Sequence, residues 1–398
     1  MKVLLVNSFL HARGGDTTCL FTSWRGLEAA GHTVIPFAMR HPANLPSVWE
    51  TRFPAQIEAR AATGAARVLA AAAAIWSPGA AAAMREVLRD VRPDVAHLHH
   101  VHRHLTPSIL GPLRAAGVPV VWTLHDYEVV CPNAHLYTQG APCERCRGHR
   151  YQEAVAHRCK RESQSESLAV AVEKWVHHRL RVTERVDRFV APSRHLADTL
   201  VRFGIPAERV LHLPNPVEAL PAGGPGEGWL YAGRLTAEKG LEDLLEAARQ
   251  VPAPLDVYGG GPEAARWRAR APANVRFHGV VDAATLAGAL RRTAVVVVPS
   301  RWPENLPYAV LEAQLAGRAV VATAVGGIPE LVEDGVDGAL VPPGAPAVLA
   351  RRVAALLADS AGARAMGERA RERVLARHDV QQHVRALERL YRSVATLP

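Results

Sequence analysis

Two carboxylates stand eight residues apart, Glu304 in a polar stretch and Glu312 in an apolar one. The residues from Asn305 to Ala316 predict a helix with Pro307 in its first turn and an end at Gly317. The backbone N–H groups of Asn305 and Leu306 would then lie at the helix start, where the helix dipole favours a phosphate group. This stretch therefore predicts phosphate binding beside two carboxylates.

Further residues of the same kind lie elsewhere in the chain. Arg234 and Lys239 precede a helix expected from Leu241 to Arg249, and two fixed cations beside a helix start can hold and neutralise a diphosphate. His125 follows a strand expected from Val118 to Leu124. Its side chain would lie at the carboxyl edge of a parallel sheet, which is where open α/β sheets bind ligands.

These residues need strands and helices to position them, and the chain alternates between the two. The four valines before Pro299 predict a strand that is buried on both faces, as in a parallel sheet. Residues 2–6 predict a first strand, followed by a turn with Gly14 and Gly15, a helix and a second strand, which is the opening of a Rossmann-like unit without a GxGxxG fingerprint. Ala-rich helices are expected at about residues 55–74 and 80–88, and residues 331–376 are expected to be mainly helical.

The length of 398 residues exceeds one compact core and predicts two domains. A Gly- and Pro-rich stretch at 219–228 marks the boundary, so we expect a first domain at 1–216 and a second at 217–380. With 48% hydrophobic residues the composition is that of a globular protein. The net charge of +9 comes mostly from dispersed arginines, which argues against nucleic-acid binding, since that favours clustered basic residues with interleaved aromatics.

Four cysteines gather at 131–159, a Cys-rich insertion in the first domain. Cys143 and Cys146 have the C-x-x-C spacing that lets both thiolates reach one tetrahedral ion, and Cys131 and Cys159 complete four ligands. We therefore expect a structural zinc site. The alternatives are His149 or His157 in place of one cysteine, an iron–sulfur cluster, or reduced thiols without an ion. Five cysteines in a chain with no visible secretory signal argue against a disulfide scaffold, and we expect a cytoplasmic protein.

Several phrases resemble retaining nucleotide-sugar glycosyltransferases of the GT-B fold, family 4. The Glu304 and Glu312 pair resembles the family's E-x7-E signature, and the other matching phrases follow in the family's order: the Gly14–Gly15 loop with GHTV, PDVAHLHH, TLHDY, HLPNPV, GRLTAEKG and VYGGGP. Some bacterial members carry a similar CP…CxxC insertion after HDY. The resemblance implies an α/β fold of two Rossmann-like domains with parallel sheets facing a central cleft, and a C-terminal helix, 381–398, that crosses back to the first domain.

The resemblance also implies roles for single residues. His125 and Glu304 would contact the donor sugar and act in catalysis, and Glu312 would hold the ribose. The remaining donor-binding residues would be Gly14, Gly15, Arg234, Lys239, Gly279, Val280, Asn305 and Leu306. The donor would be a nucleoside diphosphate sugar, with UDP favoured over GDP, and the acceptor a hydroxyl of a glycan, a lipid-linked molecule or a small molecule. No cofactor is required for the chemistry.

Two other functions are alternatives to this one. A sugar-nucleotide epimerase of the same architecture would shuttle protons with carboxylates and histidine, and it would not need the GRLTAEKG cations. A zinc-stabilised nucleic-acid binder is disfavoured by the spread of the arginines. Peripheral contact with the inner face of a membrane stays open as an explanation of the positive charge.

Overall fold

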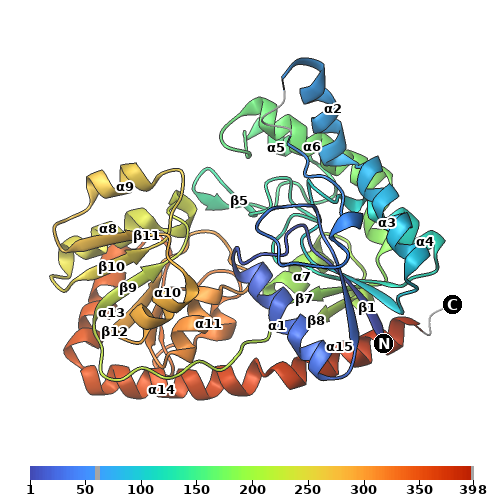
Figure 1. Ribbon diagram of the computed structural model, residues 1–398. Helices are drawn as coiled ribbons and strands as arrows, with labels where there is room; N and C mark the ends of the chain where they lie inside the picture. Colours follow the sequence, from blue (N-terminus) through green and yellow to red (C-terminus); the bar gives the residue numbers. More distant parts are fainter. Residues whose placement is uncertain (59–62, 396–398) are drawn as a thin grey trace. The chain divides into compact units, whose positions relative to one another are not determined.

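The computed structural model describes residues 1–58 and 63–395. Its contacts divide the chain into two compact units. Unit 1 comprises the described residues of Met1–His135, Glu144–Pro216 and Val380–Pro398, and unit 2 comprises Leu136–Cys143 and Val217–Asp379. Each unit has its own parallel sheet covered by helices, so the expectation of an α/β protein with two Rossmann-like sheets is confirmed (Figure 1).

Unit 1 is built on a six-stranded parallel sheet in the order β2-β1-β3-β4-β7-β8. The direction of the strand order reverses between β1 and β3, where α/β sheets of this kind bind ligands. The loops that follow β1, β3 and β4 are therefore neighbours at the carboxyl edge. The strands are β1 (Lys2–Val6), β2 (Thr33–Phe37), β3 (Val95–Leu98), β4 (Val120–Thr123), β7 (Arg188–Ala191) and β8 (Val210–His212).

Helices surround this sheet, and the last helix of the chain packs on the first (Figure 1). The helices are α1 (Gly15–Ala29), α2 (Gly64–Ile75), α3 (Pro78–Asp90), α4 (Leu110–Ala115), α5 (Gln152–Ala156), α6 (Gln164–Arg179), α7 (Arg194–Arg202) and α15 (Val380–Ala395), with short 3-10 turns at Glu50–Arg52, Pro107–Ile109, Val182–Arg185 and Ala207–Arg209. Residues 396–398 of the expected C-terminal segment lie outside the described residues.

Unit 2 contains a second parallel sheet, in the order β11-β10-β9-β12-β13-β14. In chain order this is 3-2-1-4-5-6, the strand order of a Rossmann domain, with its reversal point between β9 and β12. The strands are β9 (Glu227–Ala232), β10 (Leu255–Tyr258), β11 (Val275–Gly279), β12 (Thr293–Val298), β13 (Ala319–Thr323) and β14 (Ala339–Val341), and a separate hairpin joins β5 (Tyr137–Thr138) to β6 (Ala141–Pro142).

The central strand β12 is buried on both faces, as the valine run predicted. Val295 and Val297 join one apolar cluster, which includes α8 and α13, while Val296 and Val298 join the cluster on the other face, which includes α10 and α11. The helices of unit 2 are α8 (Leu241–Gln250), α9 (Ala264–Arg270), α10 (Ala283–Leu290), α11 (Tyr308–Leu315), α12 (Ile328–Leu331), α13 (Pro346–Ala358) and α14 (Ser360–Arg377), with a 3-10 turn at Ala237–Lys239.

The structure corrects three expected boundaries. The stretch expected to be mainly helical at 331–376 contains the strand β14, which is three residues long and pairs only with β13 among the described strands. The Ala-rich helix expected at 55–74 begins at Gly64 instead; residues 55–58 are not helical, and 59–62 lie outside the described residues. The helix expected from Asn305 begins at Tyr308, because a residue before proline is disfavoured from helical geometry, which excludes Leu306.

No described helix is long and apolar enough to cross a membrane by itself. Taken together, α2 and α3 meet the same test of length and composition, although the pair is bent by 49°.

Candidate functional site

In unit 2, the reversal point of the sheet brings together the loops after β9 and β12. The first loop carries Arg234 and Lys239, and the second carries Ser300 to Leu306. The Nζ atom of Lys239 donates to Oε1 of Glu304 over 2.6 Å, and its ammonium lies 5.0 Å from the centre of the Trp302 ring. The structure thus joins two residues that the sequence placed in separate motifs.

Glu304 is held at several points. Its Oε1 atom also accepts from the Ser300 hydroxyl over 2.5 Å, and its side chain is almost fully buried. Its backbone carbonyl accepts from the N–H of Gly327 over 2.7 Å, in the turn after β13. A Cβ atom on Gly326 would lie 2.1 Å from the same carbonyl oxygen, so only glycine fits there. The carboxylate is therefore fixed before any ligand binds.

Arg234 is exposed in the loop after β9, which also carries Lys239. Its backbone carbonyl accepts from the Tyr231 hydroxyl over 2.7 Å. Burial raises the pKa of Tyr231, and the charge of Glu304 raises it further, while Arg234 opposes them. The phenol therefore stays a hydrogen-bond donor and anchors the loop, which leaves the guanidinium of Arg234 available to an anion.

The second carboxylate of the pair, Glu312, lies on α11 and is half-buried. Burial raises its pKa from the ordinary value to about 7. Asn305 and Leu306 are buried in the loop before Pro307, which caps α11. Their N–H groups are therefore not in the first helical turn as expected, and any contact they make with an anion comes from the loop.

Gly279 is the last residue of β11, and Val280 follows it at the same edge of the sheet. Gly279 has a positive φ of 74°, and its carbonyl accepts from the N–H of Gly259 over 2.7 Å. Val280 is 81% exposed. Nearby, the ring of His278 stacks on Tyr258 at 4.4 Å.

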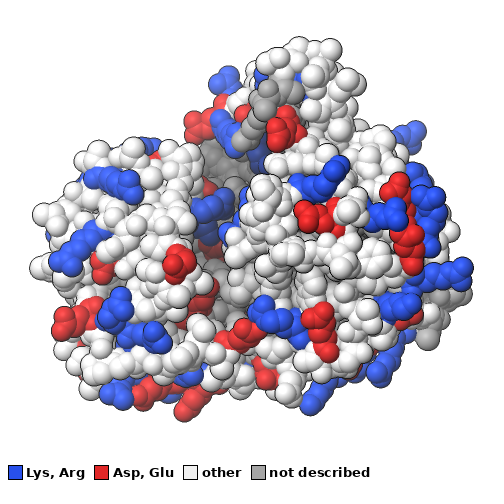
Figure 2. Space-filling model, viewed as in Figure 1, with Lys and Arg blue, Asp and Glu red and all other residues white. Residues whose placement is uncertain are grey.

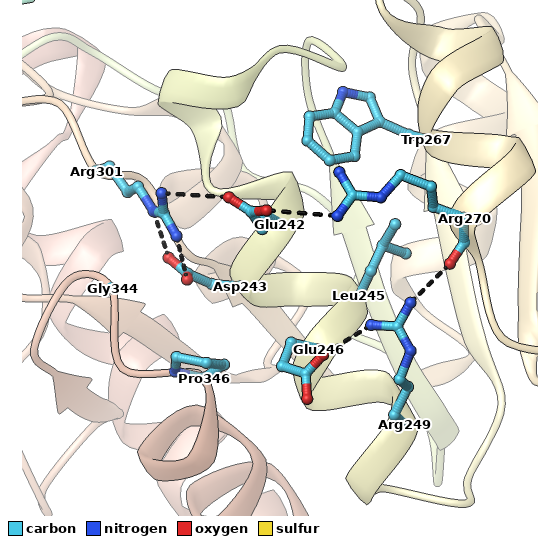
Figure 3. A pocket seen from close by; sticks show the side chains of 10 residues that line it. All are labelled: Glu242, Asp243, Leu245, Glu246, Arg249, Trp267, Arg270, Arg301, Gly344 and Pro346. Atoms are coloured by element: carbon cyan, nitrogen blue, oxygen red, sulfur yellow. Dashed lines mark hydrogen bonds and ion pairs between the residues drawn. The ribbon is translucent and has the colours of Figure 1, made fainter. Parts of the chain in front are cut away.

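An ion pair fixes the loop that carries Glu304. Arg301 binds Asp243 with two hydrogen bonds, 2.7 Å from Nε and 2.5 Å from a terminal nitrogen (Figure 3). Its backbone N–H donates to the carbonyl of Glu238 over 2.9 Å, which joins it to the Lys239 loop. Figure 3 shows this pair at one side of a cavity of about 300 Å³ beside α8. None of the expected site residues lines that cavity.

In unit 1, Gly14 caps α1, and Gly15 is its first residue. The Thr17 hydroxyl accepts from the backbone N–H groups of Arg13 and Gly14 over 2.9 and 3.2 Å, so a side chain within the first turn shapes this loop. Gly14 has a φ of 171°, an extended conformation open to any residue. A Cβ atom on Gly14 would lie 3.4 Å from Oδ1 of Asp16.

His125 follows β4 and is held by a second histidine. Its Nε2 atom lies 2.9 Å from Nδ1 of His99, and the two rings stack at 5.2 Å. Burial lowers the pKa of His125 to about 4, against the opposing charge of Asp16 in the first turn of α1. His125 is therefore neutral near pH 7, and it lies within electrostatic range of the α1 start.

Comparisons with known proteins identify the family. A model of Glycosyltransferase Family 4 matches residues 13–219, and a model of glycosyl transferases group 1 matches residues 226–359. The chain belongs to glycosyltransferase family 4. It is a GT-B glycosyltransferase.

Curated relatives of this glycosyltransferase act on varied molecules. The chain is 28% identical to 2-deoxystreptamine N-acetyl-D-glucosaminyltransferase of Streptomyces fradiae over 336 residues, which cover 79% of this chain and 74% of that protein. It is 29% identical over 240 residues to glycogen synthase of Mycobacterium tuberculosis, a match that spans 56% of either protein.

Solved structures share the fold. The Anabaena protein HepE in complex with UDP and glucose has a TM-score of 0.70 at 18% identity, covering 99% of this chain and 100% of that one. Sucrose-phosphate synthase from Thermosynechococcus elongatus has a TM-score of 0.73 at 22% identity, covering 98% of both chains.

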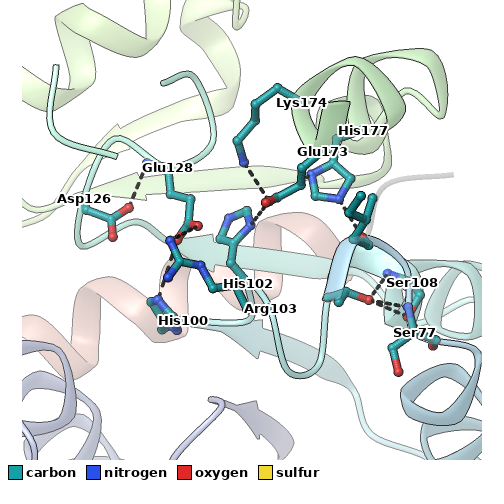
Figure 4. A network of polar contacts seen from close by, with 12 residues as sticks. Ser77, His100, His102, Arg103, Ser108, Asp126, Glu128, Glu173, Lys174 and His177 are labelled. Atoms are coloured by element: carbon teal, nitrogen blue, oxygen red, sulfur yellow. Dashed lines mark hydrogen bonds and ion pairs between the residues drawn. The ribbon is translucent and has the colours of Figure 1, made fainter. Parts of the chain in front are cut away.

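A buried polar network of the glycosyltransferase lies beside the His125 loop (Figure 4). Glu173 on α6 accepts from Lys174 over 3.1 Å, and Nδ1 of His102 lies 3.6 Å from the same oxygen. Glu128 lies 3.6 Å from both His100 and Arg103. Burial opposes its charged form, but His102, Lys174 and Arg103 hold the pKa of Glu128 below its ordinary value. The network ties α6 to the loops after β3 and β4.

Three groups in the described chain bring possible metal ligands within 4.8 Å of one another: Cys19 with His99 and His125, His102 with Glu173 and His177, and His100 with Asp126 and Glu128. In the second group Lys174 already neutralises Glu173, and in the third Arg103 lies against Glu128. In the first, the hydrogen bond between the two histidines engages one nitrogen of each ring. We assign a metal to none of them.

The four cysteines proposed for zinc belong to different units. Cys131, Cys146 and Cys159 are in unit 1, and Cys143 is in the hairpin segment assigned to unit 2. Cys146 and Cys159 pack in one small cluster with Tyr151, and the Cys131 thiol donates to the Asn133 side chain over 2.9 Å. Burial, together with the nearby Cys146 and Cys131, raises the pKa of Tyr151 to about 12. Thiolates are ligands that zinc prefers.

Sequence reasoning missed several residues that shape the site: Ser300, Arg301, Asp243, Gly326 as the support of Glu304, and His99 as the partner of His125. Of these, only His99 lies in a sequence pattern that could have indicated its role. His97 and His99 alternate at the end of β3, so their rings share one face, and they lie 4.6 Å apart. The contacts of Arg301 with Asp243 and of Gly326 with Glu304 join residues 58 and 22 positions apart, which spacing alone does not reveal. Ser300 lies four residues before Glu304.

Proposed function

We propose that this glycosyltransferase moves a sugar from a nucleoside diphosphate sugar to an acceptor hydroxyl and retains the anomeric configuration. The observation that carries the proposal is the bond from Lys239 to Glu304 at the reversal point of the unit 2 sheet. A cation and a fixed carboxylate side by side suit a donor that has a diphosphate next to a sugar.

We propose different hydrogen-bonding roles for the two carboxylate oxygens of Glu304. Oε1 accepts from both Ser300 and Lys239, which directs Oε2 to the hydroxyl groups of the donor sugar. The neutral ring of His125 suits a hydrogen bond to the same sugar, since an uncharged imidazole neither repels nor neutralises the departing diphosphate. We propose these two as the catalytic residues.

In the reaction that we propose, the bond from the anomeric carbon to the diphosphate oxygen breaks on the face where the acceptor oxygen attacks. The leaving phosphate oxygen takes the acceptor proton, so no protein nucleophile is needed. Arg234, Lys239 and the start of α1 at Gly14–Gly15 would stabilise the negative charge that develops on the diphosphate. The loop N–H groups of Asn305 and Leu306 would add to this, and we propose no cofactor for the chemistry.

The nucleoside would lie over Gly279 and Val280, and its ribose hydroxyls would donate to Glu312. We favour UDP over GDP, a choice supported by proteins of the same fold solved in complex with UDP or UDP-glucose. Relatives are named for 2-deoxystreptamine and for D-inositol 3-phosphate. We therefore propose an acceptor hydroxyl in glycan, glycolipid or natural-product biosynthesis, in the cytoplasm.

The test is the shift of melting temperature with UDP, GDP, their sugar conjugates and NAD, each well above a micromolar dissociation constant. A nucleotide that binds only the folded protein at 100 times its dissociation constant adds about 2.7 kcal/mol of stability. We expect UDP and UDP-sugars to raise the melting temperature. A shift with NAD alone would refute the proposal. The anomeric configuration of the product, read by NMR, tests retention.

A further inference from the structure

Three loops of unit 1 converge on the ring of Phe9, which is buried in the loop after β1. His11, from the same loop, meets this ring edge to face at 5.4 Å between ring centres. His41, from the loop after β2, does so at 6.1 Å, and His104, from the loop after β3, at 5.4 Å. The guanidinium of Arg13 lies over the ring, 3.9 Å from its centre. These four polar side chains around one aromatic ring are called the Phe9 cluster below.

Hydrogen bonds within the loops orient two of the histidine rings. Nδ1 of His41 accepts from the backbone N–H of Ala43 over 3.2 Å, so the proton of the neutral ring is on Nε2. Nδ1 of His11 donates over 3.3 Å to Oδ1 of Asn44, an oxygen that also accepts from the N–H of Leu10. The two rings stack at 4.5 Å, and both residues are partly exposed. Because each Nδ1 atom is engaged within the loops, the Nε2 atoms are the ones that can contact a ligand.

The fixed charge of the Phe9 cluster is positive. Within the described residues, none of its four members forms an ion pair with a carboxylate. Burial lowers the pKa of His104 to about 4, and so do four nearby positive side chains: His100, Arg13, Arg103 and His41. The Nδ1 atom of His104 is buried and has no hydrogen-bond partner in the described part of the chain. On the face seen in Figure 2, by contrast, Lys and Arg are dispersed among Asp and Glu, so no broad basic patch gathers anions there.

The carboxylates at this edge of the sheet lie outside the Phe9 cluster. Glu128 lies 3.6 Å from both His100 and Arg103, so we do not count these two cations as free for a ligand. Asp126 accepts from the backbone N–H of Glu128 over 2.8 Å, and Asp16 is in the first turn of α1. An anion beside Arg13 would therefore supply a charge partner that the described carboxylates do not.

Three imidazoles together could also suggest a metal ion, but the geometry favours an anion. His11, His41 and His104 are not among the described groups whose ligand atoms lie within 4.8 Å of one another. The guanidinium of Arg13 would repel a metal cation, whereas its planar donors match the oxygens of phosphate and carboxylate groups. Donors that come from three different loops suit the three terminal oxygens of a phosphate better than the two of a carboxylate.

The Phe9 cluster lies close to the proposed reaction centre. The loops after β3 and β4 are neighbours, because these strands pair in the sheet. The charge of His100 lowers the pKa of both His104 and His125, so His100 is within electrostatic range of both rings. The nucleoside and ribose contacts proposed for the donor all come from unit 2, which leaves this edge of unit 1 for the acceptor.

We propose that His11, Arg13, His41 and His104 bind a phosphate group of the acceptor, an inference that rests on the sugar transfer proposed above. The acceptor is then a phosphorylated molecule, with the hydroxyl that receives the sugar directed towards His125. Arg13 pairs with the phosphate, and Phe9 holds the guanidinium in place beneath it. The Nε2–H group of His41 donates to a second phosphate oxygen.

The experiment is isothermal titration calorimetry of the full chain with UDP at saturation, so that the proposed donor contacts are already occupied. The probes are glycerol 3-phosphate, inorganic phosphate and glycerol. We expect glycerol 3-phosphate and inorganic phosphate to bind and glycerol, which lacks the anion, not to bind. Arg13→Gln with His41→Gln should weaken the binding of glycerol 3-phosphate by about tenfold or more, since it removes a charged donor and a neutral one.

The matched control is His178→Gln with Arg179→Gln, which removes the same two residue types from exposed positions on α6 and should bind glycerol 3-phosphate like the unchanged chain. Circular dichroism checks that each variant folds. Absence of glycerol 3-phosphate binding, or equal binding in the two double variants, would overturn the proposal. So would phosphate binding that UDP abolishes, because the anion would then lie at the donor contacts.

Two further outcomes separate this inference from the proposed function. Inorganic phosphate that binds at least tenfold more tightly than glycerol 3-phosphate would refute the acceptor role, since the cluster would then hold a free anion. A chain that binds UDP but neither phosphate probe contradicts this inference alone. A chain that binds the phosphate probes but not UDP refutes the proposed sugar transfer, and the acceptor role with it.

Discussion

Lys239 donates a hydrogen bond of 2.6 Å to Glu304 across 65 residues of sequence, in the part of unit 2 where the strand order reverses. The Arg301 pair with Asp243 supports this contact, because it fixes the Glu304 loop against α8. A buried carboxylate and its cation are thus positioned before a donor arrives, and preorganised charge is the main way in which enzymes stabilise a charged transition state.

The first prediction concerns Lys239. Lys239→Ala should weaken UDP binding by about 1–3 kcal/mol, the range for one hydrogen bond to a charged group. Isothermal titration calorimetry measures the change. Lys2→Ala removes an exposed lysine from the amino end of β1 and should leave the affinity unaltered. Equal UDP affinity in the Lys239 variant and the unchanged chain would remove Lys239 from the donor site.

The second prediction concerns the hydrogen bond between His99 and His125. His99→Phe keeps a ring of similar size but removes the nitrogen that fixes His125, so the rate of sugar transfer should fall by roughly 5- to 100-fold, as expected for a buried hydrogen bond of about 1–3 kcal/mol. The Michaelis constant for the donor should change much less. His99→Asn retains a polar group and should recover part of the rate. If the Phe variant turns over normally, His125 needs no support from His99.

The third prediction is a pH dependence that comes from Glu312. Its pKa is about 7 in the folded chain and about 4.3 in an unfolded one, so the folded state holds the proton longer. Stability contributed by this group is present below pH 4.3 and is lost as pH rises to 7, by up to about 3 kcal/mol. Glu312→Gln removes that loss, so this variant should be the more stable one at pH 8 and nearly equal to the unchanged chain at pH 4.

Urea unfolding across this pH range tests the third prediction. Glu208→Gln is the control, because Glu208 is exposed and should give no difference that changes with pH. A constant difference between the Glu312 variant and the unchanged chain would mean that Glu312 titrates normally.

The fold class followed from the sequence because buried parallel strands leave continuous apolar runs, such as Val295 to Val298, that need no partner to be seen. Motif residues with fixed local spacing, such as Glu304 and Glu312, could likewise be named in advance. The pairing of Lys239 with Glu304 could not, since it depends on which strands are neighbours. The start of α11 at Tyr308 was missed because Pro307 was placed inside the helix rather than at its cap. The exposure of α2 could not be foreseen either, since its composition is that of a buried helix.

The fourth prediction concerns zinc. We propose that Cys131, Cys143, Cys146 and Cys159 hold one structural ion, so the purified chain should contain one zinc, which Cys143→Ser with Cys146→Ser removes. Because structural zinc contributes folding energy, the melting temperature should fall while UDP affinity is kept. Cys19→Ser is the control and should retain the zinc. Its loss in that variant would place the ion at His99 and His125 instead, and absence of zinc from the purified chain would refute the site.

The last prediction concerns Gly326. It distinguishes the support that this residue gives to Glu304 from the strain that any side chain at a positive φ angle would cause. Gly326 and Gly335 have positive φ values of 56° and 77°, so alanine at either position costs about 1–2 kcal/mol of stability. A Cβ atom on Gly335 meets nothing within 4 Å, whereas one on Gly326 would lie 2.1 Å from the Glu304 carbonyl oxygen. Gly335→Ala should therefore lower the melting temperature but keep the transfer rate. Gly326→Ala must also push the Glu304 loop away from Ser300 and Lys239, so its rate should fall far more than its stability loss explains. Equal transfer rates in the two variants would mean that the position of Glu304 does not limit the reaction.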